Sequence, residues 1–188
     1  MTSSRDVDPT KPWEVLEEHE MFVANRLRVT RETVRLQDGR IISDYYQIHM
    51  GLAAVTAATR PDGRLILLNM YKHGPRRGGI GFPGGGIEKD EKPLVAAQRE
   101  LKEETGFGGG QWAPLGDYTV HSNQGCGHLY YFHAQNVELV AVPTADDLEP
   151  HQLLFLTRDE VRDAVAGARF LSLGHICLAG LWLNNIQP

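Results

Sequence analysis

The chain has 188 residues, of which 41% are hydrophobic, and its formal net charge is −5 with a sequence pI near 5.9. This length and apolar content predict one domain with a small extension. The negative charge argues against a general nucleic-acid binder, which needs a positive field to attract phosphates.

The first quarter of the chain predicts a small antiparallel sheet. From residue 26 onward, apolar residues alternate with polar ones, which is typical of strands. Asp38-Gly39 is a hairpin turn signal, and residues 41–50 supply the returning strand. We therefore expect two parts: an N-terminal tail with antiparallel strands over residues 1–49, and the main domain over residues 50–188.

Two apolar runs follow, residues 51–59 and 64–71, and the turn signal Pro61-Asp62-Gly63 separates them. Such runs are typical of the central strands of a domain. Lys72 and Arg76 lie at the end of the second run and in the loop beyond it. Both are candidates for pairing with a substrate phosphate. A surface role that serves only solubility is the alternative, and the sequence leaves both open.

A helix is predicted over about residues 92–105. Pro93 suits the first turn, where its missing N–H costs nothing, and Gly106 suits the left-handed residue that ends a helix. Apolar residues recur along this helix at intervals of three and four, which predicts one stripe that packs on a sheet. The stripe consists of Leu94, Ala97 and Leu101.

The neighbouring face of this helix carries three carboxylates, on Glu100, Glu103 and Glu104. At these spacings they repel one another, and only Arg99 and Lys102 lie near enough in sequence to offset the repulsion. Carboxylate oxygens are hard ligands and no Cys or His shares the face, so the pattern predicts Mg²⁺, with Mn²⁺ as the alternative. A solvated acidic face is the competing interpretation, and the flanking residues disfavour it.

Those flanking residues are glycines, an arginine and a further glutamate. Gly84-Gly85-Gly86 precedes the helix and lets the backbone approach the same ions, so the Gly84 carbonyl is a candidate oxygen ligand. Gly85, Glu91 and Arg99 are better interpreted as structural braces of the site.

The spacing is Gly85, five residues, Glu91, seven residues and then RELKEETGF over residues 99–107. This pattern resembles the Nudix box, the signature of hydrolases that act on a nucleoside diphosphate linked to another group, and it matches at every defining position. The resemblance implies a Nudix fold, an α/β/α sandwich with a mixed sheet, here preceded by the small antiparallel sheet. It also implies that the three glutamates after Arg99 hold the metals and take part in catalysis.

Weaker similarity extends from Trp13 to about Val165 and resembles ADP-ribose and nucleotide-sugar pyrophosphatases. It implies cleavage of ADP-ribose or a nucleotide sugar into a nucleoside monophosphate and a sugar phosphate. It also implies a homodimer, in which the N-terminal sheets exchange between subunits and complete the substrate pocket. Two positions depart from that subfamily: Asn123 replaces a typical proline, and His128 replaces a frequent acid.

The base that deprotonates the attacking water has two candidates. Glu103 is one, because it belongs to the metal cluster. The resemblance implies Glu149 as the other, since a late loop glutamate serves as base in the ADP-ribose-type relatives. Two other activities also stay open: a nucleotide-sensing module that does not hydrolyse, and a hydrolase of damaged nucleoside triphosphates or capped RNA.

The rest of the chain predicts further strands and two helices. Thr157 and Glu160 form a capping box at the start of a helix over residues 158–166. The apolar segment 170–183 is too short to span a bilayer and predicts a packed C-terminal helix. The two cysteines match no redox or metal spacing, so we expect a cytoplasmic protein with reduced thiols. Strands are expected at residues 118–122, 128–135 and 153–156.

Overall fold

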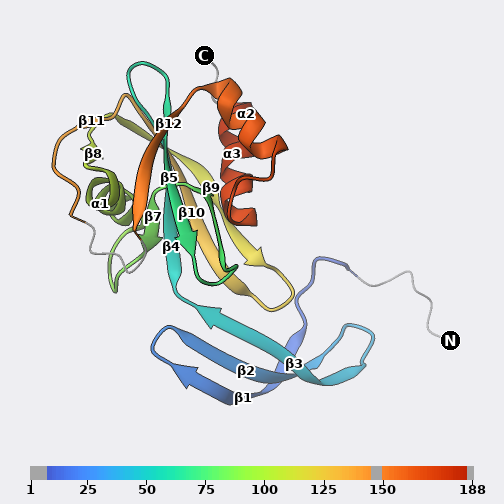
Figure 1. Ribbon diagram of the computed structural model, residues 1–188. Helices are drawn as coiled ribbons and strands as arrows, with labels where there is room; N and C mark the ends of the chain where they lie inside the picture. The colour runs from blue at the N-terminus through green and yellow to red at the C-terminus, as the bar shows by residue number, and fades with distance from the viewer. Residues whose placement is uncertain (1–7, 145–149, 186–188) are drawn as a thin grey trace. The chain divides into compact units, whose positions relative to one another are not determined.

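The computed structural model describes residues 8–144 and 150–185 (Figure 1). These residues form two compact units. Within these ranges, the first unit comprises the residues up to Gly51 together with His121–Gly127, and the second comprises Leu52–Val120 together with the residues from His128 onward.

The first unit is a three-stranded antiparallel sheet in the order β1-β2-β3. Its strands are β1 (Glu14–Ala24), β2 (Leu27–Arg35) and β3 (Ile41–Met50). The sequence predicted β2 and β3 but not β1. All but one of the residues of β1 are exposed, and its glutamates interrupt the apolar alternation that would mark a strand. Ion pairs from Arg28 to Glu18 at 3.0 Å and from Arg35 to Glu14 at 2.7 Å join β1 to β2.

The second unit is built on a seven-stranded mixed sheet. Its main path runs β12-β5-β4-β10-β9, with β6 paired to β5 and β7 paired to β4. The β4–β10 pair is parallel, whereas β5 pairs antiparallel with β4, β6 and β12. The strands are β4 (Leu52–Thr59), β5 (Leu65–Lys72), β6 (Arg77–Gly81), β7 (Gly84–Gly86), β9 (Gln111–His121), β10 (Cys126–Gln135) and β12 (His151–Leu156), with β8 (Phe107–Gly108) and β11 (Glu138–Leu139) as a separate short pair.

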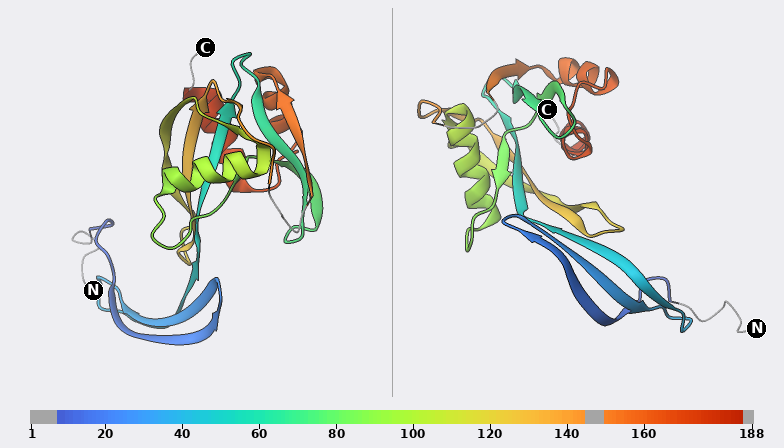
Figure 2. Two further views of the ribbon diagram at one scale, coloured as in Figure 1. Left: turned by 90° about the vertical axis from the view of Figure 1, so that its left-hand side faces the viewer. Right: turned by 60° about the horizontal axis from the view of Figure 1, so that its bottom comes forward.

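Helices cover both faces of this sheet (Figure 2). Side chains alternate along β4, so that Ala54 packs with Ala96 of α1 (Pro93–Thr105) on one face, whereas Val55 belongs to the same core as Trp182 of α3 (Leu173–Asn185) on the other. The helix α2 (Arg158–Ala166) lies on the same side as α3 and contributes to that core. The predicted α/β/α arrangement with a mixed sheet is confirmed.

The helix predicted from the box spacing is α1, and its ends lie where the sequence placed them. Gly106 has a φ of 75° and its N–H donates to the Lys102 carbonyl, as a left-handed cap requires. The apolar stripe differs from the prediction, because Leu94 is 38% exposed and Ala96 is buried in its place. The buried face of α1 also includes Glu104, which is only 9% exposed.

The C-terminal helices confirm two further predictions. The Thr157 side chain accepts the Glu160 N–H while the Glu160 carboxylate accepts the Thr157 N–H, which completes the capping box of α2. The C-terminal apolar segment forms α3 and buries Leu178, Ala179 and Trp182. Within the described ranges, none of the helices has both the length and the apolar character that a bilayer crossing requires.

Candidate metal centre

The backbone of β7 lies directly against the carboxylates of α1. The Gly84 N–H donates to Glu104 Oε2 at 2.7 Å. Gly84 has a φ of 154°, and a Cβ at this position would lie 2.3 Å from the Ala54 carbonyl oxygen of the neighbouring strand. Only glycine therefore fits here. The close pairing of β7 with β4 places the Gly84 amide next to the carboxylate of Glu104.

Gly85 forms a cradle for the second carboxylate. A Cβ at Gly85 would meet the carboxylate carbon and both oxygens of Glu100 at 2.6 Å. No left-handed backbone angle is involved, so a larger residue here would have to displace the Glu100 carboxylate. The carboxylate of Glu100 therefore rests on the backbone of β7, beside the strand whose amide binds Glu104.

Arg99 holds the remaining acidic groups together. Its guanidinium makes two hydrogen bonds of 3.0 Å to the carboxylate of Glu91, one from Nε and one from Nη2. Nη1 donates to Glu100 at 2.7 Å and to Glu103 at 3.1 Å, and Nη2 also donates to the Gly86 carbonyl at 3.0 Å. A planar fork with five donors can hold three carboxylates in this way, which a lysine could not.

The ionisation of this network follows from its contacts. The hydrogen bonds that Arg99 donates to Glu91, followed by those to Glu100 and Glu103, raise the pKa of its guanidinium. The same Arg99 contact, with the Glu88 N–H, lowers the pKa of Glu91. Both groups therefore stay charged at neutral pH, and the network is a set of charge-assisted hydrogen bonds.

The donor set fits a hard divalent cation. Glu100, Glu103 and Glu104 offer only oxygen, and the glycines of β7 let the strand backbone lie directly against Glu100 and Glu104. Across residues 8–144 and 150–185, however, no three His, Cys, Asp or Glu side chains are gathered closely enough to hold an ion. Arg99 bridges Glu100 and Glu103 instead. The fit rests on donor chemistry and on the glycine cradle, and the Gly84 carbonyl stays a predicted ligand.

The other predicted residues lie apart from this cluster or outside the described part of the chain. Lys72 is exposed at the end of β5, and Arg76 is exposed in the following loop with a φ of 53°. Their proposed contact with substrate stays a prediction. Glu149 lies outside the described residues.

Two histidines that the sequence analysis did not single out make contacts between distant segments. His151 Nε2 lies 2.9 Å from the Glu104 carbonyl oxygen and ties the end of α1 to β12. His175 Nδ1 accepts the Phe82 N–H at 3.0 Å, and its ring stacks on Phe82 with 6.1 Å between centroids. Burial lowers the pKa of His175 to about 4, with a further contribution from the charge of Lys72. These contacts join residues 47 and 93 positions apart, so no local spacing could have indicated them.

Comparisons with known proteins agree with this geometry. The NUDIX domain family matches residues 49–176, which is well over half of the chain. An ADP-ribose pyrophosphatase from Bacillus subtilis is 36% identical over 76 residues, which is 40% of this chain and 40% of that protein. The chain thus spans less than half of that relative's length.

Two broader similarities have lower identity. A CMP-5'-(N-acetyl-N-hydroxy-3-aminopropyl)phosphonate hydrolase from Streptomyces rubellomurinus is 26% identical over 168 residues, which is 86% of this chain and 80% of that protein. The crystal structure of an ADP compounds hydrolase superposes with a TM-score of 0.81 at 21% identity, over 95% of this chain and 98% of that one, which shows the shared fold. With the family match over residues 49–176, these findings show that the chain belongs to the NUDIX domain family.

Proposed function

We propose that the protein is a divalent-metal-dependent pyrophosphohydrolase. It cleaves a nucleoside diphosphate linked to another group, namely ADP-ribose or a nucleotide sugar, into a nucleoside monophosphate and a sugar phosphate. The observation that carries the proposal is the pair of contacts between β7 and α1, where the Gly84 amide binds Glu104 and Gly85 makes space for Glu100.

Each residue of the cluster has a part in the proposed reaction. The Gly84 amide fixes the buried carboxylate of Glu104, and Arg99 orients Glu91, Glu100 and Glu103. A bound Mg²⁺ or Mn²⁺ supplies Lewis acidity, which neutralises phosphate oxygens and acidifies water. Because the Gly84 amide holds Glu104 before substrate binds, this carboxylate needs little reorganisation during the reaction.

The proton of the attacking water goes to one of two carboxylates. The side chain of Glu103 is 43% exposed, against 16% for Glu100, so it is the more accessible of the two to water. Glu149 is the alternative. Glu149→Gln distinguishes them, because it should lose most of kcat if Glu149 is the base and keep it if Glu103 is the base. Glu103→Gln does not, since Glu103 is also a proposed metal ligand. The pH profile of the active variant should still show the titration of the base.

The choice of substrate is supported by relatives of known activity. The Bacillus subtilis relative is an ADP-ribose pyrophosphatase, and the Streptomyces relative hydrolyses a CMP-linked phosphonate. Both names describe a nucleotide joined to a second group. Lys72 and Arg76 are proposed to pair with the diphosphate, and Lys72→Gln should raise KM more than it lowers kcat.

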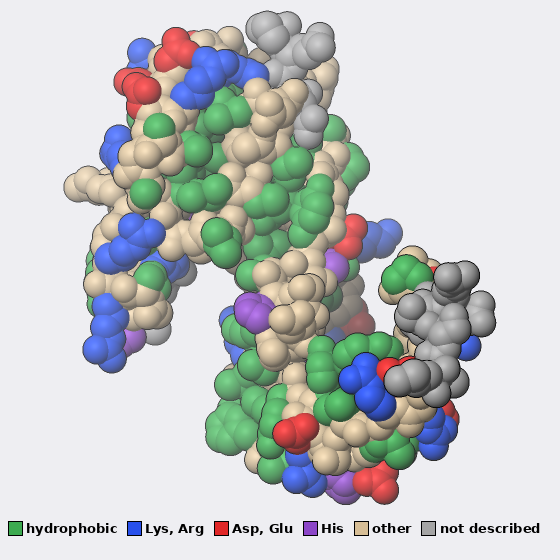
Figure 3. All heavy atoms as spheres, turned by 90° about the vertical axis from the view of Figure 1, so that its right-hand side faces the viewer, with side chains coloured by type: hydrophobic (Ala, Val, Ile, Leu, Met, Phe, Trp, Pro, Cys, Tyr) green, Lys and Arg blue, Asp and Glu red, His purple; other side chains and the backbone are tan. Residues whose placement is uncertain are grey.

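We also propose that the protein is a homodimer that uses its N-terminal sheet. Figure 3 shows hydrophobic side chains at the surface of the molecule, and on the strands of this sheet six of them are more than half exposed. These six are Val15, Met21, Phe22, Val23, Ile41 and Met50. So many exposed apolar groups on one small sheet favour an interaction surface. Light scattering should give about twice 20.9 kDa for the parent chain and a smaller mass for Phe22→Asp; a parent of monomer mass would contradict the dimer.

A substrate panel tests the proposed activity. ADP-ribose, nucleotide sugars, dinucleotides and nucleoside triphosphates are each incubated with Mg²⁺ or Mn²⁺, and products are separated by chromatography. We expect a nucleoside monophosphate and a sugar phosphate from ADP-ribose or a nucleotide sugar. Turnover of triphosphates alone would reject the assignment of ADP-ribose or a nucleotide sugar as substrate. Binding of ADP-ribose without hydrolysis would favour a sensing module.

A further inference from the structure

A groove follows β5 and β6. It contains two neighbouring cavities of 390 and 360 Å³, which share Asn69 and Gly78 in their linings. Asn69 has the same orientation along β5 as Leu65 and Leu67, which pack in the core beneath α2 and α3. Asn69 therefore lies on the face of the sheet away from the carboxylates of α1, whereas Met70 and His151, which also line the smaller cavity, have the opposite orientation. We call the two cavities together the β5–β6 groove.

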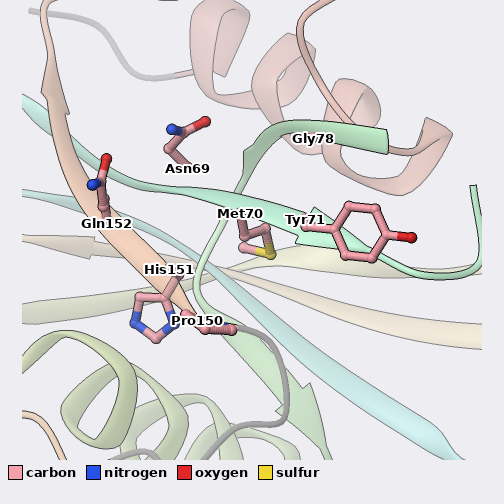
Figure 4. A pocket seen from close by; sticks show the side chains of 7 residues that line it. All are labelled: Asn69, Met70, Tyr71, Gly78, Pro150, His151 and Gln152. Atoms are coloured by element: carbon pink, nitrogen blue, oxygen red, sulfur yellow. The ribbon is translucent and has the colours of Figure 1, made fainter. Parts of the chain in front are cut away.

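One end of this groove carries two carboxamides. Asn69 of β5 lies directly opposite Gln152 of β12 in the strand register. Figure 4 shows both side chains extending to the same side of the strands, whereas His151 extends to the other. Both are exposed, and neither amide is hydrogen-bonded to another of the described residues. The pair therefore offers donors and acceptors to a ligand that carries hydroxyl or ring nitrogen groups.

The other end of the groove carries two guanidinium groups. Arg77 Nη2 donates to the Phe170 carbonyl at 2.7 Å, which anchors the side chain at the wall. Arg169 is exposed, and its guanidinium has no ion pair or hydrogen bond within the described parts of the chain. Two cations at one end of a cavity favour a phosphate group, to which guanidinium binds with paired hydrogen bonds.

The backbone at the cationic end is fixed before any ligand binds. Ile80 N–H donates to the Arg169 carbonyl at 2.9 Å, and Arg169 N–H donates to the Ala164 carbonyl at 3.0 Å. A Cβ at Gly79 would lie 2.7 Å from the Arg169 carbonyl oxygen, so glycine permits this close approach. The wall that carries Arg169 is thereby held against β6, and a ligand would not have to order it.

We propose that the β5–β6 groove binds a phosphomonoester of a nucleoside or sugar, with its phosphate at Arg77 and Arg169 and its hydroxyl or base groups at Asn69 and Gln152. A cavity of 390 Å³ has the size of a small-molecule site. The four residues proposed to bind the ligand are not among the carboxylates, the arginine or the glycines of the metal centre. The proposal therefore stands whether or not the proposed hydrolysis does.

Gly78 provides a variant that fills the groove. A Cβ at this glycine would have the Met70 carbonyl oxygen, at 3.8 Å, as its nearest neighbour, and its φ is not left-handed. Gly78→Val should therefore fold while it occupies the space between the two ends. Arg169→Gln removes one cation, and Arg162→Gln on α2, an exposed arginine paired with Asp159, is the matched charge control.

The experiment is calorimetric titration of the full chain in the presence of EDTA, with AMP, ribose 5-phosphate, adenosine and inorganic phosphate as separate ligands. We expect AMP or ribose 5-phosphate to bind, and Gly78→Val and Arg169→Gln each to weaken binding about tenfold or more. Arg162→Gln and Glu104→Gln should leave the affinity unchanged. Adenosine and inorganic phosphate should bind about tenfold more weakly than the intact phosphomonoester, because each engages only one end.

Three results would overturn the proposal. They are no heat of binding with either phosphomonoester, binding that survives both Gly78→Val and Arg169→Gln, and binding that Glu104→Gln abolishes, which would place the ligand at the metal centre. If inorganic phosphate bound as tightly as AMP, the carboxamides of Asn69 and Gln152 would make no contribution to binding. Shifts of the Gly78, Gly79 and Ile80 amide resonances on adding ligand give an independent readout, which also serves if Gly78→Val does not fold.

Discussion

The helices α1 and α3 have the same length of 13 residues and cover opposite faces of one sheet, yet they are built for different tasks (Figure 1). The helix α1 buries small residues such as Ala96 and Ala97, and it also buries Glu104. By contrast, α3 buries Leu178 and Trp182 and carries no Asp, Glu, Lys or Arg.

The difference separates stability from chemistry. Apolar area removed from water on the α3 face stabilises the fold, whereas the charged groups on α1 are held by specific hydrogen bonds that cost desolvation. Substitutions on the two helices should therefore have different signatures. Changes to the carboxylates of α1 should affect rate with little effect on stability, and changes to the buried apolar residues of α3 the reverse.

The largest effect is expected for Glu104→Gln. The amide oxygen of glutamine can still accept the Gly84 N–H, so the fold should survive, but the charge needed by a cation is lost. We expect kcat for ADP-ribose or a nucleotide sugar to fall about 10³-fold. Lys102→Gln on the exposed side of α1 is the control and should keep full rate. A Glu104→Gln enzyme within about twofold of the parent would contradict the role of this carboxylate.

On α3, Leu178→Ala should lower the free energy of unfolding by about 2–5 kcal/mol, because Leu178 is fully buried and the change leaves a cavity. Urea unfolding measures this loss. Leu173→Ala, at the 79% exposed start of the same helix, should cost less than about 0.5 kcal/mol. The kcat of folded Leu178→Ala protein should equal that of the parent. A large loss of kcat would contradict the proposal that α3 serves stability and α1 serves catalysis.

The two helices also differ in what the sequence predicted. The spacing from Gly85 to Phe107 predicted α1, its glycine cap and its carboxylates, because these depend on local periodicity. It did not predict that Glu104 would be buried, since that depends on β7 and its amide, 20 residues away in sequence. Leu94 was placed in the stripe by spacing alone, although the sheet is contacted by Ala96 instead.

Contacts between distant segments account for most of what the sequence missed. Neither the His151 contact to α1 nor the His175 contact to Phe82 has a local signal, because each depends on the sheet order. The strand β1 was missed because its exposed residues show no apolar alternation. Substrate residues are the hardest to predict, since surface lysines and arginines such as Lys72 and Arg76 have the same pattern with or without a ligand.

Acid should destabilise the α3 face through its histidines. Burial lowers the pKa of His133 to about 4, against 6.5 for an ordinary histidine, and His175 behaves alike. Above pH 6.5 neither residue is protonated in either state. As the pH falls below 6.5, these histidines bind protons in the unfolded chain but stay neutral in the folded protein. Stability is therefore lost down to about pH 4.

At pH 5 the loss should be about 2 kcal/mol for each of these two histidines. Urea unfolding at pH 7.5 and pH 5.0 measures it. His133→Gln should show a smaller loss between these two pH values than the parent, whereas His121→Gln, an exposed histidine, should show the same loss as the parent. An equal pH dependence for His133→Gln and the parent would mean that His133 titrates normally in the folded state.

The smallest effect is expected for Gly85→Ala. The added Cβ would meet the Glu100 carboxylate at 2.6 Å, and this flexible side chain can move aside, so the fold should persist. The displaced carboxylate should lower kcat about tenfold, or about 1.4 kcal/mol in the activation free energy. Gly74→Ala, where the added group meets nothing within 4 Å, is the matched control. Equal rates for both variants would show that the cradle does not position Glu100.

The central claim is that the carboxylates of α1, supported by β7, hold the divalent cation. Titration of Mn²⁺ into the metal-free protein, followed by the loss of the free-ion EPR signal, tests it most directly. We predict that Glu100→Gln and Glu104→Gln each weaken Mn²⁺ binding about tenfold or more while Lys102→Gln leaves it unchanged. Equal Mn²⁺ affinity in the parent and in both glutamine variants would contradict the claim.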